Sequence, residues 1–577
     1  MGLQKQYIKY GQTARDKIFG IPPDTRRNGA TPLSMLISHG AKFNNNSVAV
    51  IILGIITLIV GVLFSSIPWI DYFILRNLRL WNNTLSFHYW QRPGVIRLTK
   101  VYIFNVTNPD GFLNGEKPKL VEVGPFVYRE DMEKVNIKFH DNYTVTYQHK
   151  KILQFVPELS IDKNVKVLTP NIPLLTLSSQ TNKIGAILGA GVSFALMMTK
   201  MLYGPKFQPF ISVTVNELLF GYEDTLVNMA HTFYPRNIRP DMSKMGLLLG
   251  RNGTLTEVST INTGHNGMEK FGYLDHLNGM SRLPFWDSEP CTNITASEGS
   301  FFPPREYTDN DMRYVYDKDL CRIIPLEYRN TVYKDGIPAD YYGIPENIYG
   351  DSDSNMNNSC YDTEDYKAPK GLQNISPCQY SAPVYISNPH FYLADNKLLE
   401  SVEGLTPNQS LHESYFKIQP KLGVPLEGKV RVQLNLKVDQ SIYINSLKNF
   451  RSFIFPIIWV EEGIAELTPS IRRWIYLATV FGPAALPILS YSMILAGSFM
   501  LMFVFVRAYK GFFSGGSAYK NFVFHSDPTV ELLEMGRRSL RRGSSFLVQH
   551  QHRIMMHHQR DSYMLLKTNT NEIDLMT

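Results

Sequence analysis

Two long uncharged apolar runs lie near the two ends of the chain, at 48–70 and 475–506. A bilayer core of about 30 Å requires about 20 helical residues, each rising about 1.5 Å. Both runs therefore predict membrane-spanning helices. The first lies too far from the N-terminus, and is too long, for a cleaved signal peptide, so it is interpreted as an uncleaved signal anchor rather than a buried core helix. The second run is longer than a span requires, so its span is expected to begin near Phe481 or later, with Pro483 and Pro487 at its luminal end, where a helix start tolerates them.

The region between the runs shows the two-residue alternation that is typical of β-strands. From Val430 to Val438 every second residue is apolar and the residues between are polar, which predicts a strand with one buried face. The segments 135–139 and 143–147 alternate in the same way around Asp141-Asn142, which predicts a hairpin. Further strands are expected at 95–104, 120–128 and 384–386. The predicted fold class is α+β, a mostly antiparallel β-domain with helical insertions.

One part of this middle region is expected to be helical, at about 177–235. Its segment 184–202 is apolar enough to imitate a third span, but it contains Lys200 and would put the two tails on opposite sides of the membrane. We favour a partly exposed helix that contacts lipid or a partner; a helix packed in its own core is the alternative. A second helix is expected from Thr214, with core residues at helical spacing: Leu218, Leu219, Tyr222 and Leu226.

The distribution of charge gives the chain an orientation. Residues 1–47 carry a net charge of +5 and residues 507–577 carry +4, whereas the whole chain carries +7, so the segment between the spans is slightly acidic. Basic flanks remain on the cytoplasmic side of a membrane. Both tails are therefore predicted to be cytoplasmic and to face anionic lipid, and a nucleic-acid partner is not expected.

Cysteines and glycosylation signals support the same orientation. All four cysteines lie between the spans, as do eight N-x-S/T sequons, and the tail 507–577 has neither. This distribution predicts an oxidising, glycosylated luminal or extracellular domain. Four cysteines allow three connectivities by sequence alone. The sequons begin at Asn82, Asn105, Asn142, Asn252, Asn293, Asn357, Asn374 and Asn408.

The expected organisation has five parts: a cytoplasmic tail 1–47, a first transmembrane helix 48–70, an ectodomain 71–474, a second transmembrane region 475–506 and a cytoplasmic tail 507–577. Within the ectodomain several motifs are distinctive. They are NVTNPDGFLNGEKPKLVEVGPFVYRE from Asn105, NTGHNG from Asn262, LPFWDSEPC ending at Cys291, PVYISNPHF from Pro383 and EGLTPNQSLHESYFKIQPKLGVPLEG from Glu403.

These motifs resemble those of the class B scavenger receptors, the group of the fatty-acid translocase, lysosomal integral membrane protein type 2 and the sensory neuron membrane proteins. The resemblance covers nearly everything between the two spans. It implies an antiparallel β-barrel ectodomain with an apical helical bundle and a lipid tunnel that leads toward the bilayer. It also implies the disulfides Cys291–Cys360 and Cys321–Cys378, whereas the third disulfide common in the family is absent.

In such receptors the apex binds lipoprotein, phospholipid, fatty acid or a partner protein. The resemblance places ligand-binding residues here at Lys183, Met198, Lys200, Leu202 and Lys206. These three lysines are the only basic residues between Lys166 and Arg236, so the cationic patch is expected to be thin.

No enzyme motif accompanies these features. The sequence contains no GxSxG, HExxH, P-loop or CxxC pattern, and its glycine cluster at 185–191 does not follow a strand. The tail histidines between His550 and His558 are interpreted as part of a solvated tail. No catalytic site, metal site or cofactor is therefore expected.

The C-terminal tail carries two overlapping sorting patterns. Asp561 with Leu565-Leu566 matches an acidic dileucine signal, and Tyr563 with Leu566 matches a tyrosine-based signal. Both are short extended motifs that clathrin adaptors bind in the cytosol. The tail is therefore predicted to direct the protein through endosomes or lysosomes.

The sequence thus predicts a two-span membrane receptor that binds lipid or lipoprotein and mediates lipid uptake, transfer or endocytosis, at the plasma membrane or in endosomes and lysosomes. One alternative is a lysosomal or endosomal sorting receptor for a luminal protein. Another is a phagocytic or adhesion receptor at the cell surface.

Overall fold

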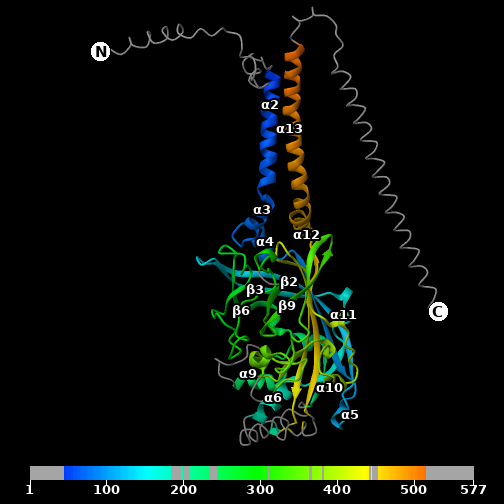
Figure 1. Cartoon of the computed structure of the whole chain (residues 1–577). Helices are drawn as coiled ribbons and strands as arrows, with labels where there is room; N and C mark the ends of the chain where they lie inside the picture. The colour runs from blue at the N-terminus through cyan, green and yellow to red at the C-terminus, as the bar shows by residue number, and fades with distance from the viewer. Residues whose placement is uncertain are drawn as a thin grey trace, which may run out of the picture. The chain divides into compact units, whose positions relative to one another are not determined.

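The computed structural model (Figure 1) describes residues 45–183, 197–198, 208–233, 243–308, 311–362, 367–379, 382–440, 444, 447 and 452–514. Its helices are α2 Asn45–Ser66, α3 Trp69–Leu78, α4 Leu85–Gln91, α5 Pro109–Leu113, α6 Ile172–Lys183, α8 Val215–Phe220, α9 Thr225–Phe233, α10 Asn396–Glu400, α11 Gln409–His412, α12 Pro469–Tyr476 and α13 Gly482–Ser514. Its strands are β1 Val95–Val106, β2 Leu120–Phe139, β3 Thr144–Phe155, β4 Lys166–Pro170, β5 Phe210–Thr214, β6 Gly253–Asn262, β7 Leu274–Leu277, β8 Met312–Asp317, β9 Arg322–Lys334, β10 Ile337–Gly343, β11 Gln373–Asn374, β12 Val384–Ser387, β13 Tyr415–Gln419, β14 Val424–Val438 and β15 Phe453–Leu467.

Two helical stretches are long and apolar enough to cross a membrane, by length and composition. They are Asn46–Ser66 and the continuous stretch Pro469–Lys510, which joins α12 to α13 through a π-helical segment, Leu477–Phe481. The first helix ends at Ser66, short of the predicted end at residue 70, and residues 69 and 70 belong to α3. The second helix is continuous from Pro469, so the expected start near Phe481 corresponds only to the start of its α13 part at Gly482. Pro487 lies inside α13 rather than at its start.

Thirteen of the strands form one large antiparallel sheet with the order β7-β6-β3-β2-β1-β15-β14-β13-β10-β9-β8, to which β12 and β11 are added beside β14, whereas β4 and β5 form a separate pair. The order does not close into a ring of paired strands in the described part of the chain. The two edges are nevertheless joined by Ser297, which forms isolated bridges to Tyr273 beside β7 and to Val315 in β8. The N–H of Ser297 donates to Tyr314 O at 2.9 Å, and its carbonyl accepts from Tyr316 N at 2.7 Å. The sheet therefore curls until a single segment bridges its edges.

The predicted hairpin is present. Strands β2 and β3 pair antiparallel, with Phe139 opposite Val145, and the turn closes through His140 N to Thr144 O at 2.9 Å. The other expected strands correspond to β1, the first half of β2, and β12.

The alternating segment 430–438 is a strand, β14, and its apolar face is buried as expected at its end, at Leu436 and Val438. Nearer its middle the burial is reversed, because Val430, Val432 and Leu434 are only half-buried, whereas Arg431 and Gln433 are buried. The polar face is covered by the segments around His390 and Ser414, which supply hydrogen-bond partners. Buried polar groups are tolerated where they are hydrogen-bonded, so polar residues of a strand can lie inside.

The sequence predicts a helical region at about 177–235, but the structure shows that this region is not helical throughout. Strand β5 lies within it and pairs with β4, and the helix expected from Thr214 is broken into α8 and α9. Thr214 caps α8 with its side chain, as Glu217 N–H donates to its hydroxyl at 3.2 Å. Gly221 then ends the helix with φ of +120°, a conformation that favours glycine.

Helices gather at both ends of the strands. In Figure 1, α3, α4 and α12 lie together at one end, and α6 and α9 lie at the other. The helices at the second end cover a large core that contains Leu174, Leu218, Phe210 and Phe455. The helices at the first end follow directly from the apolar spans, because α3 begins three residues after α2 ends and α12 leads into α13.

Candidate functional site

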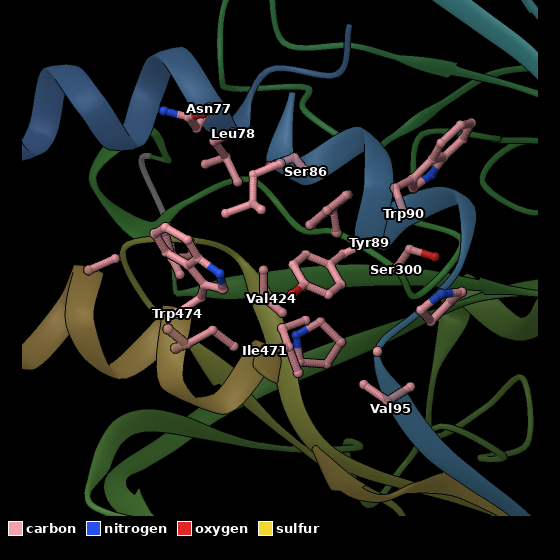
Figure 2. Close-up of a pocket in the computed structure, with 18 of the residues that line it drawn as sticks. Asn77, Leu78, Ser86, Tyr89, Trp90, Val95, Ser300, Val424, Ile471 and Trp474 are labelled. Atoms are coloured by element: carbon pink, nitrogen blue, oxygen red, sulfur yellow. The ribbon is translucent and has the colours of Figure 1, made fainter. Parts of the chain in front are cut away.

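An apolar cavity of about 130 Å³ lies among α3, α4 and α12 and the ends of β1, β14 and β15. Figure 2 shows side chains converging on the cavity from α3 and α4 on one side, among them Leu78 and Ser86, and from α12 on the other, among them Ile471 and Trp474. Because all of these elements lie within residues 59–494, the cavity belongs to one compact unit of the chain.

The helices line the cavity because each presents one face to it. α3 contributes Phe73, Ile74, Asn77 and Leu78; α4 contributes Leu85, Ser86, Tyr89 and Trp90; α12 and the turn after it contribute Ile471, Trp474, Ile475 and Ala478. In each helix these residues recur at intervals of three or four, with adjacent pairs, which places them on one side. Each short helix therefore forms part of the cavity wall with one of its faces.

Three of the polar side chains in the wall have hydrogen-bond partners, whereas the buried indole N–H of Trp90 has none among the described residues. Asn77 donates to Phe73 O at 2.9 Å, Tyr89 lies 3.0 Å from the Ser470 hydroxyl, and Ser300 accepts from Lys134 at 2.8 Å. The cavity thus presents mainly hydrocarbon. An apolar cavity of about 150 Å³ in a protein core remains dry and accepts apolar guests.

Large aromatic side chains are exposed on the helices that form the cavity. Phe73 and Trp474, both of which line it, are 52% and 43% exposed. Trp69, Tyr72 and Tyr476 on the same helices are also exposed. Aromatic residues with apolar bodies and polar edges are enriched where a membrane meets water. Their position next to the two spans suits contact with the lipid surface.

The wall of the cavity that contains Trp90, Arg97 and Ser300 borders a buried charged network. Lys134 is fully buried, with its ammonium 3.3 Å from Glu298 Oε1 and 5.0 Å from the centre of the Trp90 ring. Burial lowers the pKa of Lys134, and Glu298 only partly offsets this effect. Glu298 also accepts from His149 at 3.0 Å; although burial opposes its ionisation, Lys134 and His149 keep its pKa below the usual range.

A second buried carboxylate anchors two further cations at this wall. Glu130 lies 3.2 Å from Arg97 and 2.7 Å from Lys151. Burial opposes ionisation of Glu130, but these two cations hold its pKa below the usual range. Arg97 thereby has its guanidinium paired at the boundary of the apolar cavity. Sequence analysis did not predict this network, because its members lie on three separate strands, β1, β2 and β3, and in the distant loop that contains Glu298.

The four cysteines form two disulfides, Cys291–Cys360 and Cys321–Cys378. This is the pairing that the family resemblance implies. The bonds tie the loop after β7 and the turn between β8 and β9 to the segment around 356–378.

The sequons differ in accessibility. Six of the asparagines are exposed, Asn105 is half-buried in β1, and Asn374 is only 4% exposed. The Asn374 carboxamide oxygen accepts from the N–H of Ser376 at 2.9 Å. A buried side chain leaves little room for a glycan, so from the structure we expect Asn374 to carry none, unlike the expectation from its sequon. The exposed six are Asn82, Asn142, Asn252, Asn293, Asn357 and Asn408.

Most of the expected ligand-binding apex lies outside the described residues. The apex residues Lys200, Leu202 and Lys206 lie outside the described residues. The residues of the predicted sorting motif in the tail also lie outside them: Asp561, Tyr563, Leu565 and Leu566. Met198 is described and is 39% exposed. Lys183 is the last residue of α6. The proposed apex site therefore stays a prediction, and the apolar cavity lies at the end of the strands opposite α6.

Comparison with known proteins identifies relatives over most of the chain. Residues 49–508 match the CD36 family. Scavenger receptor class B member 1 of Mus musculus is 32% identical over 74% of this chain and 82% of its own length. Lysosome membrane protein 2 is 32% identical in Mus musculus and in Homo sapiens, over 71% of this chain and 83% of the relative.

Proposed function

Because the chain belongs to the CD36 family of class B scavenger receptors, we propose that it is a membrane receptor that binds lipid in the apolar cavity and exchanges it with the bilayer. The observation that carries the proposal is the cavity itself, whose lining is almost entirely hydrocarbon. A lipid acyl chain gains about 0.8 kcal/mol for each methylene that it buries. Receptor function, rather than catalysis, also agrees with the names of the relatives.

The route between cavity and bilayer would pass between α3 and α12. Both helices adjoin the spans, and each contributes a lining residue that is also exposed, Phe73 from α3 and Trp474 from α12. Arg472 and Arg473 are exposed on α12 beside Trp474 and would meet lipid phosphates. A lipid tail leaving the bilayer would then exchange one apolar surrounding for another without crossing water.

The proposal includes the orientation and architecture expected from the sequence. The ectodomain is luminal or extracellular, both tails are cytoplasmic, and the curled sheet is a barrel in which the cavity is the membrane-side part of a lipid tunnel. The basic tails and the clustered sequons support this orientation. The bridge at Ser297 supports the barrel.

The proposal is tested by lipid binding to the purified full chain after it has been stripped of endogenous lipid and reconstituted in nanodiscs. A fluorescent acyl-chain probe should bind with saturation. Replacing Ser86→Phe fills the cavity and should weaken binding at least about 10-fold, because the added ring occupies the ligand's volume. His88→Phe alters the same helix at an exposed position outside the cavity and should leave binding unchanged. Equal binding by all three proteins would refute the cavity assignment.

A second candidate function is sorting of a luminal partner to lysosomes. It is favoured by the overlapping motifs at Asp561–Leu566 and by similarity to proteins named lysosome membrane protein 2. The double variant Leu565→Ala/Leu566→Ala should move the protein from endosomes or lysosomes to the cell surface. The apex would hold the partner, so Met198→Asp or Leu202→Asp should abolish its recovery in a pull-down. Unchanged location and recovery would exclude this candidate.

A further inference from the structure

A second cavity, of about 150 Å³, lies inside the curled sheet behind the apolar one. Strands from opposite ends of the sheet order, β6 and β8, both contribute to its lining. The two cavities share part of their lining, so they are directly adjacent. The shared residues are Arg97, Met132, Gly299, Ser300, Pro425 and Ile464.

The lining of this second cavity is strongly polar, and its acids outnumber its bases. Five carboxylates face three cationic side chains and His149. The carboxylates belong to Glu257, Glu298, Asp317, Asp319 and Glu462, and the cations belong to Arg97, Lys151 and Lys318.

Most of these charges are already paired. Arg97 and Lys151 contact Glu130, and His149 contacts Glu298. Asp319 and Glu462 both pair with Arg251. The paired groups hold the cavity's shape and leave little free charge for a ligand.

Two of the acids lack such a partner. Among the described residues, neither Glu257 nor Asp317 has a basic group within ion-pair distance. Burial raises the pKa of Glu257, and burial together with Asp319 and Glu462 raises the pKa of Asp317 to about 6. Lys318 acts on Glu257 electrostatically without pairing, and burial lowers its own pKa. Oδ1 of Asp317 already accepts from the N–H groups of Asp319 and Leu320, at 2.9 and 3.2 Å. The acceptors left for a ligand are therefore Oδ2 of Asp317 and the Glu257 carboxylate, and this surface disfavours an anion.

A donor outside normal hydrogen-bond geometry completes the cavity. Tyr316 is 7% exposed and lines the cavity; its hydroxyl lies beside the Glu257 carboxylate and interacts with it, but the two are outside normal hydrogen-bond geometry, which leaves the hydroxyl open to a ligand atom. Nδ1 of His149 is likewise buried without a partner. Buried polar atoms left unpaired cost about 1–3 kcal/mol each. A polar ligand atom or water in the cavity would remove this cost.

We propose that this second cavity is the head-group chamber of the lipid site and that it selects long-chain amphiphiles with an uncharged hydroxyl head over those with a carboxylate head. The inference rests on the proposed function, since the apolar cavity would hold the tail. A hydroxyl both donates and accepts, so it can donate to Glu257 or Asp317 while accepting from Tyr316. A carboxylate would instead enter a chamber whose acids already outnumber its bases.

The test is displacement of a bound fluorescent acyl probe from the full chain in nanodiscs at pH 7.4, by hexadecanol and by hexadecanoate. Hexadecanol should displace the probe at a concentration at least about 10-fold lower. Tyr316→Phe should weaken displacement by hexadecanol about 5-fold and leave hexadecanoate unchanged. The double variant Glu257→Gln/Asp317→Asn should reduce the difference between the concentrations of hexadecanol and hexadecanoate that displace the probe. Glu327→Gln, at an exposed position outside both cavities, is the matched control.

The outcomes separate the two claims. If no probe binds to the wild-type chain, the proposed lipid function fails. If the probe binds but hexadecanoate competes as well as hexadecanol or better, the chamber holds only water and the inference is overturned while the lipid function stands. The comparison of the two competitors on the wild-type chain decides this even if a variant does not fold.

Discussion

His390 and His412 stack face to face, with their ring centroids 4.5 Å apart and their planes within 3° of parallel. Both side chains are buried. Nε2 of His390 lies 2.6 Å from Glu122, which also accepts from the Trp459 indole at 2.7 Å. Nδ1 of His412 accepts from the N–H of Asn408 at 3.0 Å. Two imidazoles in this arrangement cannot both be protonated without placing like charges in contact.

This stack predicts that acid destabilises the ectodomain. Burial, followed by the charges of His390 and Arg431, lowers the pKa of His412 to about 4, while Glu122 opposes the shift. Between pH 6.5 and pH 4 the unfolded chain therefore binds more protons at this residue than the folded chain, so stability falls as pH falls through this window. The free energy of unfolding should be about 1 to 2 kcal/mol lower at pH 5 than at pH 7.4 from this residue alone.

The measurement is denaturant unfolding of the full chain in detergent at both pH values, followed by tryptophan fluorescence. His412→Gln keeps an acceptor for Asn408 but does not titrate, so its loss of stability between pH 7.4 and pH 5 should be smaller by that amount. Gln409→Asn in the same short helix serves as the control. An identical pH dependence in all three proteins would show that His412 is not the titrating group. Glu122 acts in the same direction but at lower pH, because burial opposes its ionisation while His390 and Trp459 lower its pKa.

Glycan occupancy should follow exposure rather than the sequon pattern. Site-resolved mass spectrometry of the chain from a secretory host is expected to find glycan at exposed Asn142 and Asn408 and none at Asn374. Asn374→Gln should consequently leave the electrophoretic mass unchanged, whereas Asn142→Gln should reduce it by one glycan. Full occupancy at Asn374 would mean that this part of the fold differs from the structure.

The sheet should not tolerate a side chain at Gly463. A Cβ there would collide with the carbonyl oxygen of Gly428 on the neighbouring strand β14, where backbone has little freedom to move. Gly463→Ala should lower the free energy of unfolding by about 2 to 3 kcal/mol, from overpacking. Gly250→Ala is the control, since a Cβ there has no neighbour within 4 Å. Equal stability of the two variants would contradict the close pairing of β14 and β15.

The two apolar helices should depend on small residues where they meet. Within residues 59–494, a Cβ on Gly61 of α2 would lie 2.9 Å from Ile494 N and 3.0 Å from Ser490 O of α13. Small residues allow close approach of helices in a membrane. Gly61→Leu should therefore reduce the free energy of unfolding in detergent by about 1 to 3 kcal/mol. Val62→Leu changes an exposed neighbour and should have no comparable effect; similar losses in both variants would argue against this contact.

Hydrophobic periodicity predicted the coarse architecture well. The apolar runs, the hairpin at Asp141-Asn142 and the strand at 430–438 could be recognised because each depends on local sequence alone. The burial of Arg431 and Gln433 in β14 could not be predicted, since His390 and Ser414, which cover this polar face, come from distant loops. The break at Gly221 was missed because Tyr222 and Leu226 continue the apolar spacing beyond it.

The cavities were beyond sequence reasoning for the same physical reason. The helical spacing of Ile471, Trp474 and Ile475 signals an amphipathic helix, but not that its face meets Leu78 and Ser86, almost 400 residues earlier. His390 and His412 lie in the motifs that carry the family resemblance, although neither shows its partner in the sequence. Only folding brings such residues together.

The most direct test of the account is to map where a lipid resides in the full chain. A photoactivatable diazirine lipid should be crosslinked in reconstituted membranes, and the labelled peptides should be sequenced by mass spectrometry. Labelling is expected in α3, α4 and α12, at peptides containing Leu78, Ser86 and Ile471, and it should be lost in Ser86→Phe. Labelling confined to the spanning helices, or unchanged in that variant, would contradict the claim that the apolar cavity is the lipid site.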